Sequence, residues 1–277
     1  MSVKYCFLLL TILLTNCKQT NTSINLTKEE KDSIAKKLDK YSTYFYQPSD
    51  IHRTYKDSAI MYTPAKVNYI QRLSYSYKKV GDHIKAMEIL NKAVNIDLKN
   101  NKPDALQYRA WSLLYFYRDY IKTIKDVELV EKITKEPYNP CWGEPCGLIK
   151  GQALYKLGKF DEAIQTFKRV NEEEEKLNLK PEGNHLIFFY IGRCYTEKKD
   201  YDKAIENFIK ASKASSDLFP ETDYQLGLIY KAMGNLKKAK EYLLRAQKIQ
   251  DYKLQEPYIE RFDEVFPYMI KNALDSL

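Results

Sequence analysis

Glycine, proline and histidine are scarce in this 277-residue sequence, which contains 9 Gly, 10 Pro and 3 His. A β-sandwich with many tight turns uses glycine and proline at those turns, so this fold class is disfavoured. Long stretches rich in lysine and glutamate run without a helix breaker, which favours α-helix. Apolar residues form 44% of the chain, enough for a packed core, so a wholly disordered chain is disfavoured as well.

Familiar catalytic and nucleic-acid-binding motifs are also missing. The sequence contains no HExxH, no GxSxG and no glycine-rich phosphate loop, and its histidines, His52, His83 and His185, are far apart. The formal charge of +8 comes without an arginine-rich block. It is consistent with a solvated helical surface, and it also suits an anionic membrane or an acidic partner. We therefore expect no enzyme activity, no cofactor, no metal and no nucleic-acid partner.

The longest apolar run near the N-terminus is Phe7–Leu14, which follows Lys4. A bilayer-spanning helix needs about 20 residues, so this run is too short to cross a membrane. A short positive region followed by an apolar segment is the pattern of a secretory signal. The sequence therefore predicts export from the cytoplasm.

The end of this segment, "LLTNC", resembles a bacterial lipobox, with Leu14 at the third position before Cys17. The resemblance implies that Cys17 carries diacylglycerol and becomes the mature N-terminus of a lipoprotein, modified with palmitate-type chains. Several acyl chains on one residue bind a soluble domain firmly to a membrane. Lys18, in place of Asp, implies the outer membrane by the family's sorting rule. The alternative that remains open is an ordinary cleaved signal peptide.

Similar strings recur along the rest of the chain: "GDHIKAMEILNKA", "RDYIKTIKDVELV", "GKFDEAIQTFKRV", "KDYDKAIENFIKA" and "GNLKKAKEYLLRA". In each, a turn precedes an aromatic or apolar residue, a small residue, and a bulky residue four positions later. The central small residues are Ala86, Thr123, Ala163, Ala204 and Ala239. An upstream helix with a second small residue accompanies them, as in "KGQALY", "YIGRCY" and "QLGLIY".

This pattern resembles the tetratricopeptide repeat (TPR), a helix–turn–helix unit of 34 residues. Five units fit in one phase, at residues 67–100, 104–137, 144–177, 185–218 and 220–253. The resemblance implies an all-α, right-handed superhelical solenoid, because no unit can bury its apolar face alone.

The expected organisation follows from these boundaries. Residues 1–16 form the signal peptide, 17–26 a tether, 27–66 an N-terminal helical cap or divergent repeat, 67–253 the array, and 254–277 a C-terminal capping helix. The first helix is expected to start at the capping box Thr27–Glu30. The last is expected to start near Pro257, with a kink at Pro267.

Small residues at fixed positions have a packing role, because helices in close contact lie only 8–10 Å apart. The residues predicted to occupy the helix crossings are Gly151, Ala163, Gly192, Ala204, Ala211, Gly227, Ala239 and Ala246.

In TPR arrays the first helix of each unit lines the concave side, and this implies a groove that binds a peptide. The family positions map onto Tyr75, Lys78, Lys79, Tyr108, Tyr115, Gln152, Tyr155, Lys156, Phe189, Arg193, Tyr224 and Lys231. Tyrosine, phenylalanine and arginine give large contact areas and fix acidic groups. The alternative is that this concave face is only solvated and is partly filled by the terminal helices.

The sequence contains five cysteines, and four remain to be placed after Cys17. Cys6 falls in the signal and Cys194 is expected to be a small buried residue. Cys141 and Cys146 lie in the loop "YNPCWGEPCGL", where an oxidising compartment favours a disulfide. Two free thiols, or metal or redox chemistry, are the alternatives.

The expected function is a non-enzymatic, membrane-anchored scaffold that binds an envelope protein or peptide, in the manner of an assembly factor. The alternative is a lipoprotein that captures glycans or other ligands beside an outer-membrane transporter.

Overall fold

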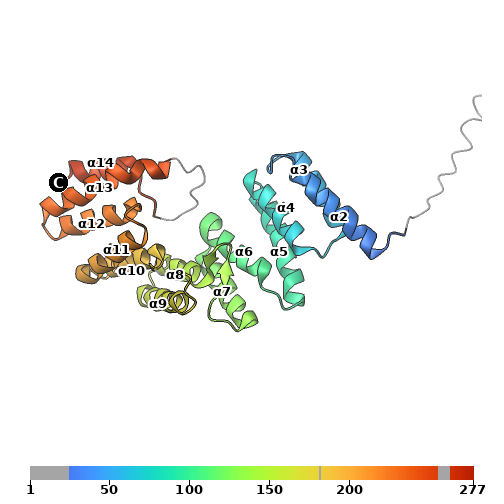
Figure 1. Cartoon of the computed structure of the whole chain (residues 1–277), viewed down its shortest axis with the longest axis horizontal. Helices are drawn as coiled ribbons and strands as arrows, with labels where there is room; N and C mark the ends of the chain where they lie inside the picture. Colours follow the sequence, from blue (N-terminus) through green and yellow to red (C-terminus); the bar gives the residue numbers. More distant parts are fainter. Residues whose placement is uncertain (1–24, 181, 255–262) are drawn as a thin grey trace, which may run out of the picture. The chain divides into compact units, whose positions relative to one another are not determined.

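The computed structural model describes residues 25–180, 182–254 and 263–277, with the side chains of 251–254 left out. The described chain is almost entirely helical, as the sequence predicts (Figure 1). It divides into two compact units at Tyr69 and Ile70.

The first unit contains α2 (Lys28–Ser42) and α3 (Asp50–Tyr62), which pack against each other. The predicted capping box is confirmed: the Glu30 backbone N–H donates to Thr27 Oγ1, and the Thr27 N–H donates to the Glu30 carboxylate. Ala35 and Ala59 are buried between the two helices.

The second unit is an array of helices that pack in sequence order. It begins within α4 (Val67–Lys79), and its other elements are α5 (His83–Lys99), α6 (Asp104–Ser112), the π-helix η1 (Leu113–Tyr117), α7 (Tyr120–Thr134), β1 (Pro140–Cys141), β2 (Glu144–Pro145), α8 (Cys146–Lys156), α9 (Phe160–Lys176), α10 (His185–Glu197), α11 (Tyr201–Ala214), α12 (Pro220–Ala232), α13 (Leu236–Leu254) and α14 (Pro267–Asp275). The helices α6, α8, α10 and α12 are the first helices of predicted units, and each packs on its own second helix. The second helices α7, α9 and α11 also pack on the next first helix, so each unit covers its neighbour.

Polar caps start most of the second helices. Asp82, Asp119, Asp200 and Asn235 each accept a hydrogen bond from the backbone N–H three residues later. A side-chain oxygen at this position satisfies an amide that the helix cannot pair. The aspartate or asparagine that recurs in four of the strings therefore helps to fix where those second helices begin, whereas α9 follows Lys159 without a side-chain cap.

Gly151, Gly192 and Gly227 lie where the two helices of one unit touch. A Cβ atom built on Gly151 would lie 2.3 Å from a Phe167 ring carbon, and one on Gly192 would lie 2.8 Å from a Phe208 ring carbon. Gly227 faces Leu243 in the same way, at 2.6 Å. In all three units the facing residue stands 16 positions after the glycine. The predicted alanines Ala163, Ala204, Ala211, Ala239 and Ala246 are all 0% exposed.

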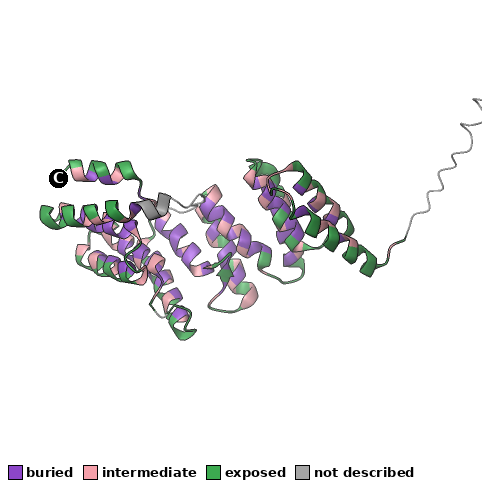
Figure 2. Ribbon diagram, turned by 45° about the horizontal axis from the view of Figure 1, so that its top comes forward, coloured by how far each residue is buried: buried purple, intermediate pink, exposed green. Residues whose placement is uncertain are grey.

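Buried residues are concentrated on the helices that pack between neighbouring units. Figure 2 shows α8 largely in the colour of buried residues, whereas α2 is mostly exposed. Aromatic rings pack both between and within units. Phe167 of α9 stacks on Tyr190 of the next unit, with ring centroids 5.9 Å apart, and Phe189 meets Phe208 within one unit at 5.7 Å.

The C-terminal helix differs from the prediction. Residues 263–266 are not helical, and α14 begins at Pro267 rather than running through it with a kink. Proline suits the first position of a helix, and the residue before it, Phe266, is extended, with φ −94° and ψ 156°. Residues 255–262, which include the predicted start at Pro257, lie outside the described residues.

Candidate partner-binding site

The predicted groove residues fall into two groups. Six of them are buried: Lys78, Tyr108, Tyr115, Gln152, Tyr155 and Phe189. The other six are partly exposed: Tyr75, Lys79, Lys156, Arg193, Tyr224 and Lys231. Because a buried ring cannot reach a partner, the candidate surface is narrower than the sequence predicts. Two clusters within the chain contain four of these six buried residues: Lys78, Tyr108, Tyr115 and Tyr155.

The first cluster, called the aromatic cluster here, surrounds the ammonium group of Lys78. Lys78 Nζ lies 3.4 Å from the centre of the Phe116 ring, 4.8 Å from Tyr75, 4.8 Å from Trp111 and 5.4 Å from Tyr108. The faces of aromatic rings carry partial negative charge and attract a cation. Lys78 is therefore only 6% exposed although it is charged. The cluster joins α4 to α6 and η1.

Trp142 completes the aromatic cluster from a different element. The strands β1 and β2 form a two-residue hairpin in which Trp142 and Gly143 have φ of 56° and 91°. Positive φ is strained for a bulky residue such as tryptophan. The indole lies 4.6 Å from the Tyr108 ring and 6.3 Å from Trp111, yet it stays 48% exposed. The hairpin therefore displays a large ring on the surface of the second repeat.

Covalent and hydrogen bonds hold the hairpin in this position. Cys141 and Cys146 form a disulfide that closes it. The Tyr115 hydroxyl donates to Glu144 Oε2 at 2.6 Å, which ties β2 to η1. The disulfide that the sequence favours is therefore present, and it supports Trp142. Trp142 itself was not predicted to be a site residue.

Trp111 was also missed, although the alignment of the repeats contains a signal for it. It occupies the position at which other units have Ser74, Gly151, Gly192 or Gly227. An indole cannot fit into a contact that in the other units admits only glycine or serine. Immediately after Trp111 and Ser112, the α-helix gives way to the π-helix η1. Such an inserted turn rotates the following residues. Here it accompanies the placement of Tyr115 and Phe116 beside the Trp111 ring.

The second cluster, called the carboxylate cluster here, brings the C-terminal segment onto the first helices of the later repeats. Asp263 Oδ1 lies 2.8 Å from Lys156 Nζ and 3.6 Å from Arg193 Nη1. The Arg193 guanidinium also stacks on Tyr155, with its central carbon 5.4 Å from the ring centre. Burial raises the pKa of Tyr155 far above its usual value, so this phenol stays protonated at neutral pH.

The remaining groove residues contact the same segment. Lys231 Nζ donates to Ser276 Oγ at 2.7 Å, and Tyr224 packs beside the buried Val265 and Ile270. Thus Lys156, Arg193, Tyr224 and Lys231 all interact with residues 263–277. Of the predicted groove, only Tyr75 and Lys79 are partly exposed with no contact to that segment in the described chain.

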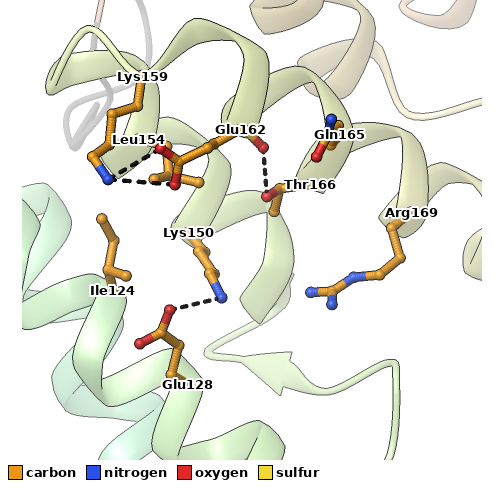
Figure 3. Close-up of a pocket in the computed structure, with 9 residues that line it drawn as sticks. All are labelled: Ile124, Glu128, Lys150, Leu154, Lys159, Glu162, Gln165, Thr166 and Arg169. Carbon is orange, nitrogen blue, oxygen red and sulfur yellow. Dashed lines mark hydrogen bonds and ion pairs between the residues drawn. The ribbon is translucent and has the colours of Figure 1, made fainter.

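A separate cavity of about 410 Å³ lies among α7, α8 and α9 (Figure 3). Its charged side chains already pair with one another: Lys150 lies 3.1 Å from Glu128, and Lys159 lies 3.1 Å from Glu162. Arg169 at its edge pairs with Glu131 at 2.6 Å. These mutual pairs already neutralise the charges that a ligand would otherwise bind. The cavity is therefore a weaker candidate binding site than the predicted groove on the first helices.

The remaining predictions concern Cys194, metal binding and the membrane. Cys194 is a free thiol at 0% exposure, and burial raises its pKa to about 12, so it is no thiolate at neutral pH. No group of three or more metal-binding side chains occurs in the part of the chain that the structure describes. Among the same residues no helix combines the length and apolar character needed to cross a bilayer. The predicted signal peptide, residues 1–16, and Cys17 lie outside the described residues.

Comparison with known proteins agrees with this architecture. The tetratricopeptide repeat family matches the chain four times, at residues 67–100, 148–176, 187–218 and 224–253. No match covers 104–137, the unit with Trp111 and the π-helix. No curated protein sequence matches the chain.

Solved structures with the same fold include PilW, described as a widely conserved type IV pilus biogenesis factor. It is 19% identical with a TM-score of 0.60, covering 82% of this chain and 96% of PilW. MamA from Desulfovibrio magneticus RS-1 is 17% identical with a TM-score of 0.54, covering 68% of this chain and 97% of that one. YrrB, described as a TPR protein with an unusual peptide-binding site, is 18% identical with a TM-score of 0.50, covering 72% of this chain and 94% of YrrB.

Identities at this level establish the fold alone. Members of the tetratricopeptide repeat family serve as scaffolds for protein interaction. The chain belongs to this family, as the four family matches, the fold of these neighbours and the paired helices with their glycine contacts together show.

Proposed function

We propose that this protein is a non-enzymatic scaffold of the bacterial cell envelope, anchored to a membrane through Cys17, which binds a protein or peptide partner with the aromatic cluster. The observation that carries the proposal is Trp142, a ring 48% exposed on a closed hairpin and backed by Tyr108 and Trp111. A tryptophan ring held half-exposed on a closed hairpin offers a large rigid apolar surface that a partner can bury.

The chemistry of the cluster suits a peptide. Tryptophan and tyrosine provide most of the binding energy in many interfaces, because they bury large rigid surfaces at low entropic cost. Partly exposed Tyr75 and Lys79 lie on the same helix as Lys78, and Lys79 Nζ lies 5.1 Å from the Tyr75 ring. A partner that stacks on Trp142 would meet polar and cationic groups at the edge of the rings.

The anchor is proposed from the sequence. The lipobox resemblance at Leu14–Cys17 supports lipidation, and Lys18 supports the outer membrane over the inner membrane. The polar residues that follow, 18–26, would separate the folded chain from the lipid surface. PilW, which shares the fold, is described as a pilus biogenesis factor, and this supports a role in assembling an envelope structure.

Capture of a glycan is the second candidate, because exposed aromatic rings also stack on sugars. The two functions separate in one experiment. Trp142 is replaced by the photo-crosslinker benzoylphenylalanine in cells, and Ile209, a second-helix residue that is 38% exposed, is replaced in a matched control. A scaffold gives a defined protein adduct from position 142 and none from position 209.

Absence of a protein adduct at position 142, together with binding of the purified protein to a glycan array, would overturn the scaffold in favour of glycan capture. Equal adducts at both positions would show that the aromatic cluster is not the binding surface.

A further inference from the structure

The C-terminal segment, residues 263–277, lies where a bound peptide would lie. Before α14 begins, residues 263–266 are not helical, and Asp263 and Val265 are directed at the first helices. The Val265 backbone N–H donates to Glu221 Oε1 at 3.2 Å, and the Val265 side chain is 3% exposed. The segment thus combines an acidic anchor, a backbone hydrogen bond and an apolar anchor, which are the contacts of a peptide ligand.

The electrostatics of the carboxylate cluster require an anion. The side chains of Lys156 and Arg193 are 23% and 16% exposed, and both approach a single oxygen of Asp263. Without Asp263, the longer pair of Arg193 with Glu197, at 3.9 Å, would remain in a partly buried site with little solvent to screen the two cations. A negative group is therefore part of the stable arrangement, whichever chain supplies it.

The fit of Asp263 is incomplete. Within the described residues, Asp263 Oδ2 and Arg193 Nε are buried without a hydrogen-bond partner. Buried polar atoms without partners cost free energy. A carboxylate approaching with better alignment could engage both oxygens and the guanidinium fork together, as arginine and carboxylate groups prefer. The internal contact is thus open to replacement.

We propose that Lys156 and Arg193 form a carboxylate-binding site that Asp263 occupies in the free protein, and that an acidic partner segment binds there by displacing residues 263–277. The preferred segment has an acidic residue followed two positions later by a β-branched apolar residue, the spacing of Asp263 and Val265. The inference rests on the proposed function, because it extends the partner surface from the aromatic cluster to the later repeats.

The test uses the full chain and a fluorescent synthetic peptide with the sequence of residues 263–277. A tethered segment acts at an effective concentration on the order of millimolar, so wild-type protein should bind the added peptide weakly. Asp263→Asn removes the charge at nearly constant shape. It should strengthen peptide binding about tenfold, as expected from loss of a charge-assisted hydrogen bond in the competing segment. Asp275→Asn, whose carboxylate pairs with Lys271 in α14, is the matched control and should bind as wild type does.

A second variant, Val265→Asp, weakens the segment through its apolar anchor and should produce the same gain. Circular dichroism establishes that each variant keeps its helices. A peptide with Asn in place of its first Asp should lose the gain with every variant. The proposal is overturned if folded Asp263→Asn and Val265→Asp bind the peptide no better than wild type, or if the Asp and Asn peptides bind equally. Either result leaves the crosslink at position 142 unaffected, so the proposed function is judged separately.

Discussion

Gly151→Ala tests the packing on which the whole array depends. The added Cβ would lie 2.3 Å from one carbon of the Phe167 ring and 2.7 Å from two others, whereas ordinary contacts between carbons are about 3.5–4 Å. Phe167 is 0% exposed and stacks on Tyr190, so its ring has no free space into which to move. Alanine gains about 1 kcal/mol over glycine in helix propensity. Overpacking costs about 1–3 kcal/mol, so we expect a net loss of up to about 2 kcal/mol.

The measurement is urea unfolding followed by circular dichroism, with the double variant Gly151→Ala, Phe167→Leu as the control. Leucine shortens the facing side chain, so the alanine should become neutral or stabilising in that background, and the two changes should not be additive. If Gly151→Ala alone stabilises the protein by its helix propensity, the contact is loose and the reasoning about glycine is refuted.

Three further predictions concern charge, the disulfide and the anchor. Burial raises the pKa of Asp223 from 3.8 to about 6, because the buried site favours the neutral carboxyl. The contribution of Asp223 to the free energy of unfolding is therefore fully present at low pH, where the carboxyl is protonated, and is lost as pH rises through about 6. Asp223→Asn should therefore gain stability relative to wild type between about pH 4.5 and pH 7.5, by up to about 3 kcal/mol in thermal unfolding, and a pH-independent difference would contradict this. Cys141→Ser should release the hairpin, lower the free energy of unfolding by about 2 kcal/mol and shift tryptophan fluorescence to the red. An unchanged spectrum would show that the Cys141–Cys146 disulfide does not hold the Trp142 indole in place. Cys17→Ser should move the protein from the membrane to the soluble fraction, and membrane retention with continued acyl labelling would refute the anchor.

The repeats could be predicted from sequence because their signal is local and recurrent. A small residue, a bulky residue and a capping aspartate return at fixed intervals, and each has one steric or hydrogen-bonding role wherever it occurs. The sequence therefore places Gly192 at a helix crossing with Tyr195, Tyr201 and Phe208 around it, and the structure shows that Phe208 is the residue in direct contact.

The binding surface was harder to predict for two physical reasons. An aromatic residue on a first helix, such as Tyr108 or Tyr155, satisfies a groove and a core equally well, and only the neighbouring elements decide between them. The contact of Asp263 with Lys156 joins residues 107 positions apart, and no periodic pattern extends over that distance. Trp111 is an intermediate case, because its departure from the repeat is visible but its consequence, the π-helix, is not.

The central claim is that the aromatic cluster binds the partner, and the affinity of the crosslinked partner, once purified, tests it most directly. Calorimetric titration compares wild type with Trp142→Ala and with Ile209→Ala, which removes a similarly accessible side chain from a second helix. We expect Trp142→Ala to weaken binding by at least about tenfold, as truncation of an interface tryptophan does, and Ile209→Ala to leave the affinity unchanged. Equal affinities for all three proteins, with the thermal unfolding of Trp142→Ala unaltered, would contradict it.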